Sequence, residues 1–272
     1  MNYEQYGPWA LVTGASRGLG AEFVRQLANK GFNIVMVARK KHLLESLATE
    51  LEKKENVKTK IISSDLSETE AANVIIKATD DIQVGLLINN ATMITGGALV
   101  KHDLQDEINL LNVNIVAPLK LTHHFGSKMR ERGRGGIIFV ASIAGYNSFP
   151  YMANYIATKS YFISLGEALY HEFKKEGVDI LVLSPSFMNT DPDDTRAPYV
   201  GIENPESIAK DKMMSVTPVV NEALENLGRK ITVFPGIESK IMAFIFKHIL
   251  SRKKVTNILR NTALEMISKD ML

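Results

Sequence analysis

Residues 9–20 read WALVTGASRGLG, and this stretch decides the fold. The apolar run at 9–12 stops just before Gly14, which predicts a buried strand that enters a tight turn. Residues 19–30 then show helical apolar spacing, and Gly31 follows as a stop signal. A strand, a glycine-rich turn and a helix in this order predict the first half of a βαβ unit.

The same alternation continues along the chain. A second strand is expected at 33–38, because residues 34–37 are continuously apolar, as in a parallel strand buried on both faces. Further strands are expected at 60–63, 85–89, 136–142, 178–184 and 230–234, and further helices at 41–55, after Ser67, at 103–131 with a bend near Pro118, and at 155–175. Ser67 and Glu70 have the spacing of a capping box. The pattern predicts an α/β fold: one doubly wound, Rossmann-type parallel sheet of about seven strands with helices on both faces.

The composition suits one domain over residues 1–272. Hydrophobic residues make up 45% of the chain, which is enough for a sizeable core. Lys plus Arg number 32 and Asp plus Glu number 30, so no strong field draws in nucleic acid. The chain has 0 cysteines and no signal-like start, so we expect a cytoplasmic protein. No metal site is expected, because the adjacent His123 and His124 would point about 100° apart on a helix.

Two segments near the C-terminus depart from the simple alternation. Residues 186–214 are irregular and proline-rich, which is typical of a substrate lid. Helices are expected within 239–272, and the most apolar stretch, 241–250, is about half as long as a membrane span. We interpret it as a buried helix packed on the sheet. The alternative is that it touches a membrane surface together with the basic residues 252–254.

Three glycines, Gly14, Gly18 and Gly20, lie between the first strand and the first helix. Such a turn lets a pyrophosphate approach bare backbone, and the helix offers unpaired N–H groups to the phosphates. An acid at the end of the second strand would bind a ribose 2′-hydroxyl, but Arg39 follows Ala38 there, and Arg17 can face the same point. A guanidinium binds a phosphate through paired hydrogen bonds, so we favour NADP(H) over NAD(H).

Tyr155 and Lys159 share one face of the predicted helix, and Ser142 lies thirteen residues before Tyr155 at the end of a strand. A phenol has a pKa near 10, which is too high for acid–base work near neutral pH. An ammonium about 5 Å away favours the phenolate by roughly 3 kcal/mol at an effective dielectric of about 20. Ser142 would hold the substrate oxygen against the hydride donor. This trio predicts a proton-handling site.

With these residues the chain resembles the short-chain dehydrogenase/reductase family. The resemblance is strong over residues 8–190 and looser to the C-terminus. It is carried in chain order by the Thr-Gly-x-x-x-Gly-x-Gly loop at 13–20, Asp65-Leu66, Asn89-Asn90-Ala91, Asn114, Ser142, Tyr155-x-x-x-Lys159, Pro185 and Thr190. Thr92 and Ser186 depart from it, because the family has glycine at both positions. These departures bear on the substrate and the rate more than on the fold.

The resemblance implies roles for these residues. Tyr155 is the expected acid/base, Lys159 binds the nicotinamide ribose, Ser142 orients the substrate, and Asn114 holds a proton-relay water. Asp65 would contact the adenine, and Asn89 would brace the central strands. A homodimer or homotetramer is also implied. The expected cofactor contacts are Gly14, Ser16, Arg17, Gly18, Leu19, Gly20, Arg39, Asp65, Leu66, Asn90, Ala91, Tyr155, Lys159, Pro185 and Thr190.

The residues expected around the substrate are mostly apolar. They are Ile94, Ile143, Tyr146, Phe149, Met152, Phe187 and Met188. We therefore expect the reduction of an apolar ketone or aldehyde, such as a fatty-acyl, steroid-like or xenobiotic carbonyl. The alternative is a protein of the same fold that senses NADP(H) or scaffolds a partner without turnover.

Overall fold

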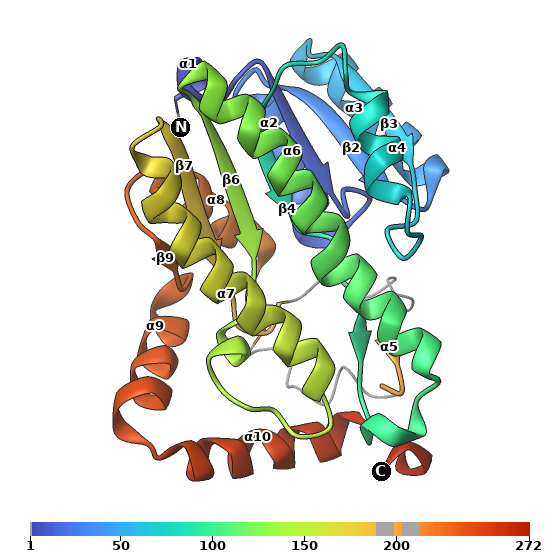
Figure 1. Cartoon of the computed structure of the whole chain (residues 1–272), viewed down its shortest axis with the longest axis vertical. Helices are drawn as coiled ribbons and strands as arrows, with labels where there is room; N and C mark the ends of the chain where they lie inside the picture. The colour runs from blue at the N-terminus through green and yellow to red at the C-terminus, as the bar shows by residue number, and fades with distance from the viewer. Residues whose placement is uncertain (1, 189–198, 203–212) are drawn as a thin grey trace.

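The computed structural model describes residues 2–188, 199–202 and 213–272, and its centre is one parallel sheet (Figure 1). The strand order is β3-β2-β1-β4-β6-β7-β9, and every neighbouring pair is parallel. The predicted doubly wound sheet is confirmed. Its strands are β1 (Trp9–Thr13), β2 (Asn33–Ala38), β3 (Thr59–Ser63), β4 (Val84–Asn89), β6 (Gly135–Val140), β7 (Val178–Leu183) and β9 (Thr232–Val233).

The chain leaves β1 toward one edge of the sheet and returns to β4 on its other side. The order of the strands therefore reverses between β1 and β4. In open sheets of this kind, ligands bind at the carboxyl ends of the strands beside such a reversal. The site should lie where β1, β4 and β6 end.

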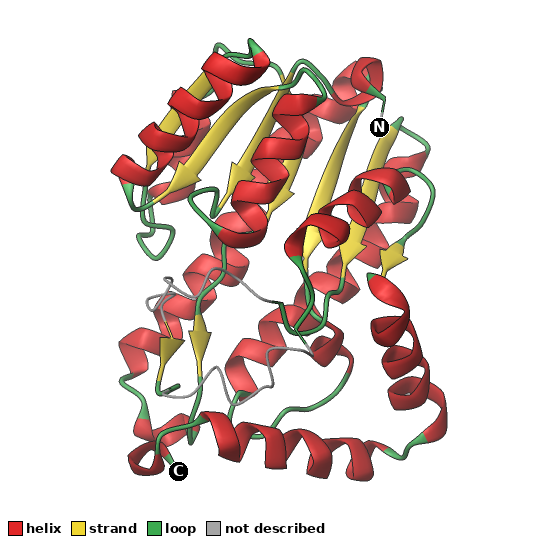
Figure 2. Cartoon of the chain, turned by 180° about the vertical axis from the view of Figure 1, so that it is seen from behind, coloured by secondary structure: helices red, strands yellow, loops and turns green. Residues whose placement is uncertain are grey.

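Helices cover both faces of the sheet (Figure 2). Side chains alternate along β1, so Ala10 and Val12 join one apolar core while Leu11 joins the other. The first core includes α2 (Gly18–Asn29), α3 (Lys41–Glu55) and α8 (Val216–Asn226). The second includes α4 (Ala71–Ala78), α6 (Ala117–Arg132) and α7 (Ala153–Lys174). In the part of the chain that the structure describes, the other helical elements are α1 (Tyr3–Tyr6), η1 (Leu99–Lys101), α5 (Leu104–Leu111), η2 (Asn112–Val116), η3 (Ile143–Tyr146), α9 (Gly236–Phe244), η6 (Ile245–Ile249), α10 (Arg252–Met266) and η7 (Lys269–Met271).

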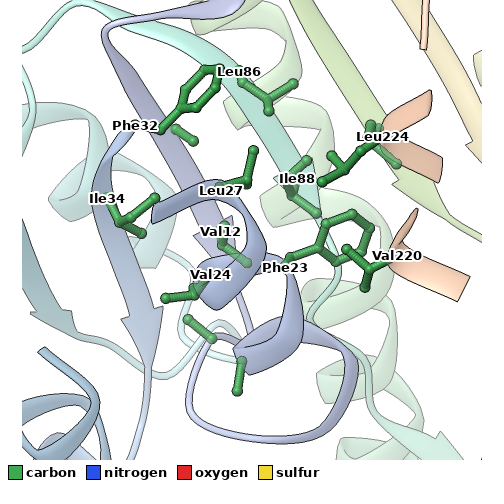
Figure 3. Packing of buried hydrophobic residues seen from close by; sticks show 14 of the residues in the cluster. Val12, Phe23, Val24, Leu27, Phe32, Ile34, Leu86, Ile88, Val220 and Leu224 are labelled. Atoms are coloured by element: carbon green, nitrogen blue, oxygen red, sulfur yellow. The ribbon is translucent and has the colours of Figure 1, made fainter. Parts of the chain in front are cut away.

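The apolar face of helix α2 holds the helix against the sheet. Phe23 and Leu27 have no exposed surface and lie between the sheet and α8 (Figure 3). They pack with Ile88 of β4 and Leu224 of α8. Burying a large apolar side chain contributes about 1.5–3 kcal/mol. This packing holds the N-terminus of α2 at the end of β1.

The predicted long helix at 103–131 is interrupted near Pro118. The π-helical turn η2 separates α5 from α6, and Pro118 lies in the first turn of α6. Proline has no N–H, so it cannot donate to the carbonyl of Asn114 four residues earlier. The missing donor accounts for a wide turn at this point, and such turns are frequent at functional sites.

The capping box predicted at Ser67 is wrong. Helix α4 begins only at Ala71, and Glu70 makes no side-chain capping bond. Ser67 instead donates from its backbone N and its hydroxyl to Asp65 Oδ1, at 3.0 and 2.8 Å. A carboxylate two residues earlier accepts both donors and forms a local turn that competes with the helix.

The C-terminal arm, residues 236–266, consists of α9, η6 and α10. The prediction that residues 241–250 form a buried helix packed on the sheet is wrong. Helix α9 buries only Ser239. Ile241, Phe244 and Ile249 are 54%, 59% and 62% exposed. Helix α10 instead crosses the end of the molecule below α7 (Figure 1). Among the described residues, no helix has both the length and the apolar character to cross a bilayer.

Part of the predicted lid can be described. Tyr199–Val200 forms strand β8 and pairs in parallel with β5 (Ile94–Thr95). Met188 and Met214 form an isolated bridge at the two ends of the segment. Residues 189–198 and 203–212, including Thr190, lie outside the described residues.

Candidate active site

The turn after β1 admits only glycine at two positions. Gly14 has a φ of +67°, and a Cβ there would lie 2.8 Å from Asn90 Nδ2. A Cβ on Gly20 would lie 2.1 Å from the carbonyl oxygen of Gly14. Both contacts are too short for a real side chain, so a methyl group at either position would force the turn apart.

This turn is tied to the end of β4 by Thr13, the first residue of the glycine motif, for which no role was predicted. Thr13 Oγ1 accepts the backbone N–H groups of Asn90 and Ala91, at 3.0 and 3.1 Å, and donates to the carbonyl of Ile88 at 3.2 Å. Asn90 Nδ2 donates in turn to the carbonyl of Thr13 at 2.8 Å. Thr13 and Asn90 therefore join β1 to β4 at the point where the strand order reverses.

Asn89 does not act as expected. It was predicted to brace the central strands, but its Nδ2 donates to Thr122 Oγ1 of α6 at 3.0 Å. Side chains of adjacent residues in a strand point to opposite faces. Asn89 thus reaches the helix layer, and Asn90 links the strands.

The start of α2 suits an anion. Arg17 is the N-cap residue, and no side chain caps the helix. The backbone N–H groups of the first turn, from Gly18 to Gly20, therefore carry the partial positive charge of an uncapped N-terminus. Together with the glycine turn, they fit the pyrophosphate of a dinucleotide. Ser16 and Arg17 lie in the same loop and are partly exposed.

Arg39 lies where β2 ends, as predicted, but it has a partner. Its Nη1 is 3.8 Å from Asp65 Oδ2, and both side chains are close to half exposed. Asp65 follows β3, the neighbouring strand, and Ser67 holds its other oxygen. Leu66 is buried in the core beside it. A cation and an anion thus share the position expected for the adenosine ribose.

The three side chains predicted to handle protons are linked to the end of β6. Ser142 follows this strand and caps η3, with its Oγ accepting the N–H of Ala144 at 3.2 Å. Lys159 donates from Nζ to the carbonyl of Val140 at 3.0 Å. The same Nζ lies 5.6 Å from the centre of the Tyr155 ring. Because Val140 and Ser142 are two residues apart, this bond holds the first turns of α7 beside Ser142.

Burial changes the acid–base character of Lys159. The side chain is 3% exposed, and burial lowers its pKa from 10.5 to about 7. A charge is costly to remove from water, so the neutral amine gains relative to the ammonium. The charge that Lys159 presents to the Tyr155 ring therefore varies with pH near neutrality, in contrast to the constant ammonium of the prediction.

Asn114 lies in η2, with its amide fully bonded. Its Oδ1 accepts the N–H of Met93 at 2.8 Å, and its Nδ2 donates to the carbonyl of Met93 at 2.9 Å and to Thr158 Oγ1 at 3.0 Å. Thr92, one of the two departures from the family pattern, has its Oγ1 3.4 Å from Asn114 Oδ1. The Asn114 side chain thus holds η2 to the segment after β4 and to α7.

The predicted substrate-facing residues do not all pack in one cluster. Phe149 and Met152 are buried against Val255 and Leu259 of α10, and Ile94 and Tyr155 pack against the same cluster. Tyr146 turns elsewhere, with its ring 5.3 Å from that of Phe234. Ile143 and Pro185 are buried, Met188 packs on the first core, and Phe187 is 36% exposed. Helices are predicted within 239–272, and α10 is one of them. Its packing against these residues is not predicted, because its apolar stripe is short and lies far from the motifs.

A phosphate-binding turn at the strand reversal and a Ser–Tyr–Lys group at the end of β6 define a nicotinamide-dependent oxidoreductase. Residues 8–198 match the model of the short chain dehydrogenase family, and the chain belongs to this family. It is therefore an oxidoreductase that binds a nicotinamide cofactor.

Relatives are similar over most of the chain. The 7β-hydroxysteroid dehydrogenase of Clostridium sardiniense is 32% identical over 243 residues, which cover 87% of this chain and 88% of that protein. The very-long-chain 3-oxoacyl-CoA reductase of Meyerozyma guilliermondii is 30% identical over 246 residues, which cover 85% of this chain and 69% of that protein. A solved 7β-hydroxysteroid dehydrogenase has a TM-score of 0.86 at 29% identity, covering 95% of this chain and 99% of its own. A short-chain dehydrogenase from Sphingobium yanoikuyae in complex with NADPH has a TM-score of 0.77 at 25% identity, covering 98% of both chains.

Proposed function

We propose that this protein transfers a hydride between NADP(H) and a carbonyl or alcohol substrate, with Tyr155 as the general acid/base. The observation that carries the proposal is the position of Lys159, which is buried, bound to the end of β6 and 5.6 Å from the Tyr155 ring. In its protonated form Lys159 is a cation beside the phenol, and a cation in this position favours the phenolate and so assists proton transfer.

Each side chain has a defined task in the reducing direction. The bound cofactor supplies the hydride. Ser142 donates a hydrogen bond to the substrate oxygen, and Tyr155 gives its proton to that oxygen. The Lys159 ammonium stabilises the phenolate that remains. The carbonyl of Asn114, which has no donor at Pro118, holds a water that returns a proton to the site.

Removing the Tyr155 hydroxyl tests this assignment. We expect Tyr155→Phe to lower kcat by about 10²–10⁴-fold, which is the usual contribution of a positioned acid or base. Binding of NADPH should persist. Tyr161→Phe, one and a half turns further along α7, is the matched control and should keep its activity. Equal turnover by Tyr155→Phe and the wild type would contradict the proposal.

The preference for NADP(H) rests on charge at the end of β2. Arg39 is present there and Arg17 lies in the glycine turn, whereas Asp65 offsets part of the charge. A guanidinium favours a 2′-phosphate, and a carboxylate repels it. We expect Arg39→Asp to weaken NADPH binding by about tenfold or more and to affect NADH less. Lys41→Asp is the control, and an unchanged preference in Arg39→Asp would refute the argument.

We propose that the substrate is a bulky, apolar ketone, with a steroid-like molecule as the first candidate. The apolar cluster of Phe149, Met152 and α10 beside Tyr155 supports a hydrophobic substrate. Similarity to 7β-hydroxysteroid dehydrogenases supports a fused-ring ketone, and similarity to 3-oxoacyl-CoA reductases supports a fatty-acyl one. A panel of 7-oxosteroids, 3-oxoacyl thioesters and small aldehydes, followed by NADPH absorbance, separates these classes. Preference for the small aldehydes would overturn the proposal.

A non-catalytic sensor or scaffold remains the second candidate. Thr92 stands where the family has glycine, and its hydroxyl contacts Asn114 Oδ1 at 3.4 Å. This contact engages Asn114, a residue of the proposed reaction, so the threonine side chain can alter the nicotinamide end of the site. NADPH binding in the absence of turnover across the panel would favour this alternative.

Membrane-surface contact is a further proposal for the C-terminal arm. Phe244 and Ile249 are exposed at the corner between α9 and α10, and Arg252, Lys253 and Lys254 follow, all exposed. Apolar side chains beside cations suit an anionic bilayer surface. Pelleting with phosphatidylglycerol vesicles, lost in Phe244→Asp/Ile249→Asp and absent with phosphatidylcholine alone, would support the contact. The oligomeric state, a homodimer or a homotetramer, stays a prediction that light scattering can test. The cytoplasmic location also stays a prediction.

A further inference from the structure

Thr158 lies between Tyr155 and Lys159 on α7 and has no exposed surface. Its hydroxyl donates to the carbonyl of Tyr155 at 2.6 Å. The same oxygen accepts a hydrogen bond from Asn114 Nδ2 at 3.0 Å. A single hydroxyl therefore connects the helix that carries the acid/base to the π-helical turn that carries Asn114.

The direction of these bonds determines how Asn114 is oriented. A hydroxyl has one hydrogen, and that of Thr158 is already donated to the carbonyl of Tyr155. Its oxygen can then only accept, so Asn114 must present its NH₂ group. The Asn114 Oδ1 is thereby directed to the N–H of Met93 at 2.8 Å, and the second amide hydrogen reaches the carbonyl of Met93 at 2.9 Å. The Thr158 hydroxyl and the Met93 backbone thus favour the same orientation of the amide, and Thr158 accepts the amide hydrogen that Met93 does not.

We propose that Thr158 is a positioning residue for the reaction, acting through Asn114. This inference rests on the proposed function. Without the hydroxyl, one amide hydrogen of Asn114 would be buried with no acceptor, and the side chain would rotate or admit water. The turn that carries the Asn114 carbonyl would then shift relative to Tyr155 and Lys159. A small displacement of this kind slows proton transfer, whereas the cofactor contacts at the glycine turn stay in place.

The test compares Thr158→Val, which keeps the branched shape, with Thr158→Ser, which keeps the hydroxyl. We expect Thr158→Val to lower kcat by about tenfold or more and to shift the pH–rate profile. The KM for NADPH should stay within about twofold, and Thr158→Ser should recover kcat to within about threefold. Thermal unfolding and NADPH binding are measured on each preparation. If Thr158→Val does not fold, Thr158→Ala removes the same hydroxyl and takes its place.

A double-mutant cycle shows whether Thr158 acts through Asn114. In an Asn114→Ala background, adding Thr158→Val should change kcat by less than about twofold. Independent, multiplying losses would overturn the inference, as would a Thr158→Val variant with the kcat and pH profile of the wild type. These outcomes differ from a failure of the proposed function, in which the wild type itself reduces no carbonyl compound, and that result would overturn both.

Discussion

Burial of Lys159 ties the stability of the cofactor-free protein to pH. Its pKa is about 7 in the fold, against 10.5 for an ordinary lysine. Between these values the unfolded chain binds more protons than the folded one, so stability rises as the pH rises. The penalty is fully present below pH 7 and disappears as the pH approaches 10.5.

Replacing Lys159 by methionine should remove this dependence. We expect Lys159→Met to gain unfolding free energy over the wild type at pH 6, and that gain should shrink on going to pH 10. The change is at most about 5 kcal/mol, at about 1.4 kcal/mol per pKa unit. Urea unfolding at several pH values measures it, with the exposed Lys53→Met as control. A difference that does not vary with pH would show that the amine is not desolvated.

The spacing of the motif residues made the placement of Lys159 beside Tyr155 and the end of β6 predictable from the sequence. Tyr155 and Lys159 are four apart on a helix, and Ser142 ends a strand, so their types and positions were sufficient. The hydrogen-bond partners of Thr13 and Thr158 were not predictable. A threonine hydroxyl bonds whatever lies within reach, and what lies within reach is decided by tertiary packing.

At the scale of an element, Pro118 controls the turn that carries Asn114. Pro118→Ala would return an N–H to the chain and offer it to the Asn114 carbonyl. We expect η2 to relax toward an α-helix, with unfolding free energy equal to or above that of the wild type and kcat about tenfold lower.

Kinetics and thermal unfolding of the same preparation measure both effects. Lys120→Ala, two residues further along α6, removes a hydrogen bond to the carbonyl of Thr69 but returns no N–H to the Asn114 carbonyl, and it is the control. Full activity in Pro118→Ala would mean that the width of this turn has no part in the reaction.

Most elements were predictable because their apolar periods are strong. Strand β2 and helix α3 begin and end where the pattern placed them. The start of α4 was not predictable, because Ser67 donates its N–H and hydroxyl to Asp65 and does not cap the helix. Local spacing identifies a capping box, but it does not show which acceptor a serine will use.

At the scale of the whole molecule, helix α10 covers the apolar side chains beside Tyr155 that we propose face the substrate. Leu259 of α10 is 7% exposed and packs in the cluster with Phe149, Met152 and Tyr155. We expect Leu259→Ala to raise the substrate KM several-fold and to leave the NADPH affinity unchanged, because the glycine turn lies in a different part of the molecule. The truncation should also cost about 2–5 kcal/mol of local packing.

The neighbouring Ile258 provides the control, because it is 47% exposed on the same helix. Ile258→Ala should leave the substrate KM close to that of the wild type. Equal effects of the two substitutions would show that α10 acts through its general stability. The position of this arm was not predictable, since an apolar run of this length suits a buried helix as well as an exposed one.

The bonds that Thr13 and Asn90 make around the glycine turn have a kinetic consequence. The chain there is held in shape before any nucleotide arrives, so little conformational entropy remains to be lost on association. Capture of the dinucleotide should therefore follow a single exponential in stopped flow, with a rate proportional to nucleotide concentration and no slow rearrangement step.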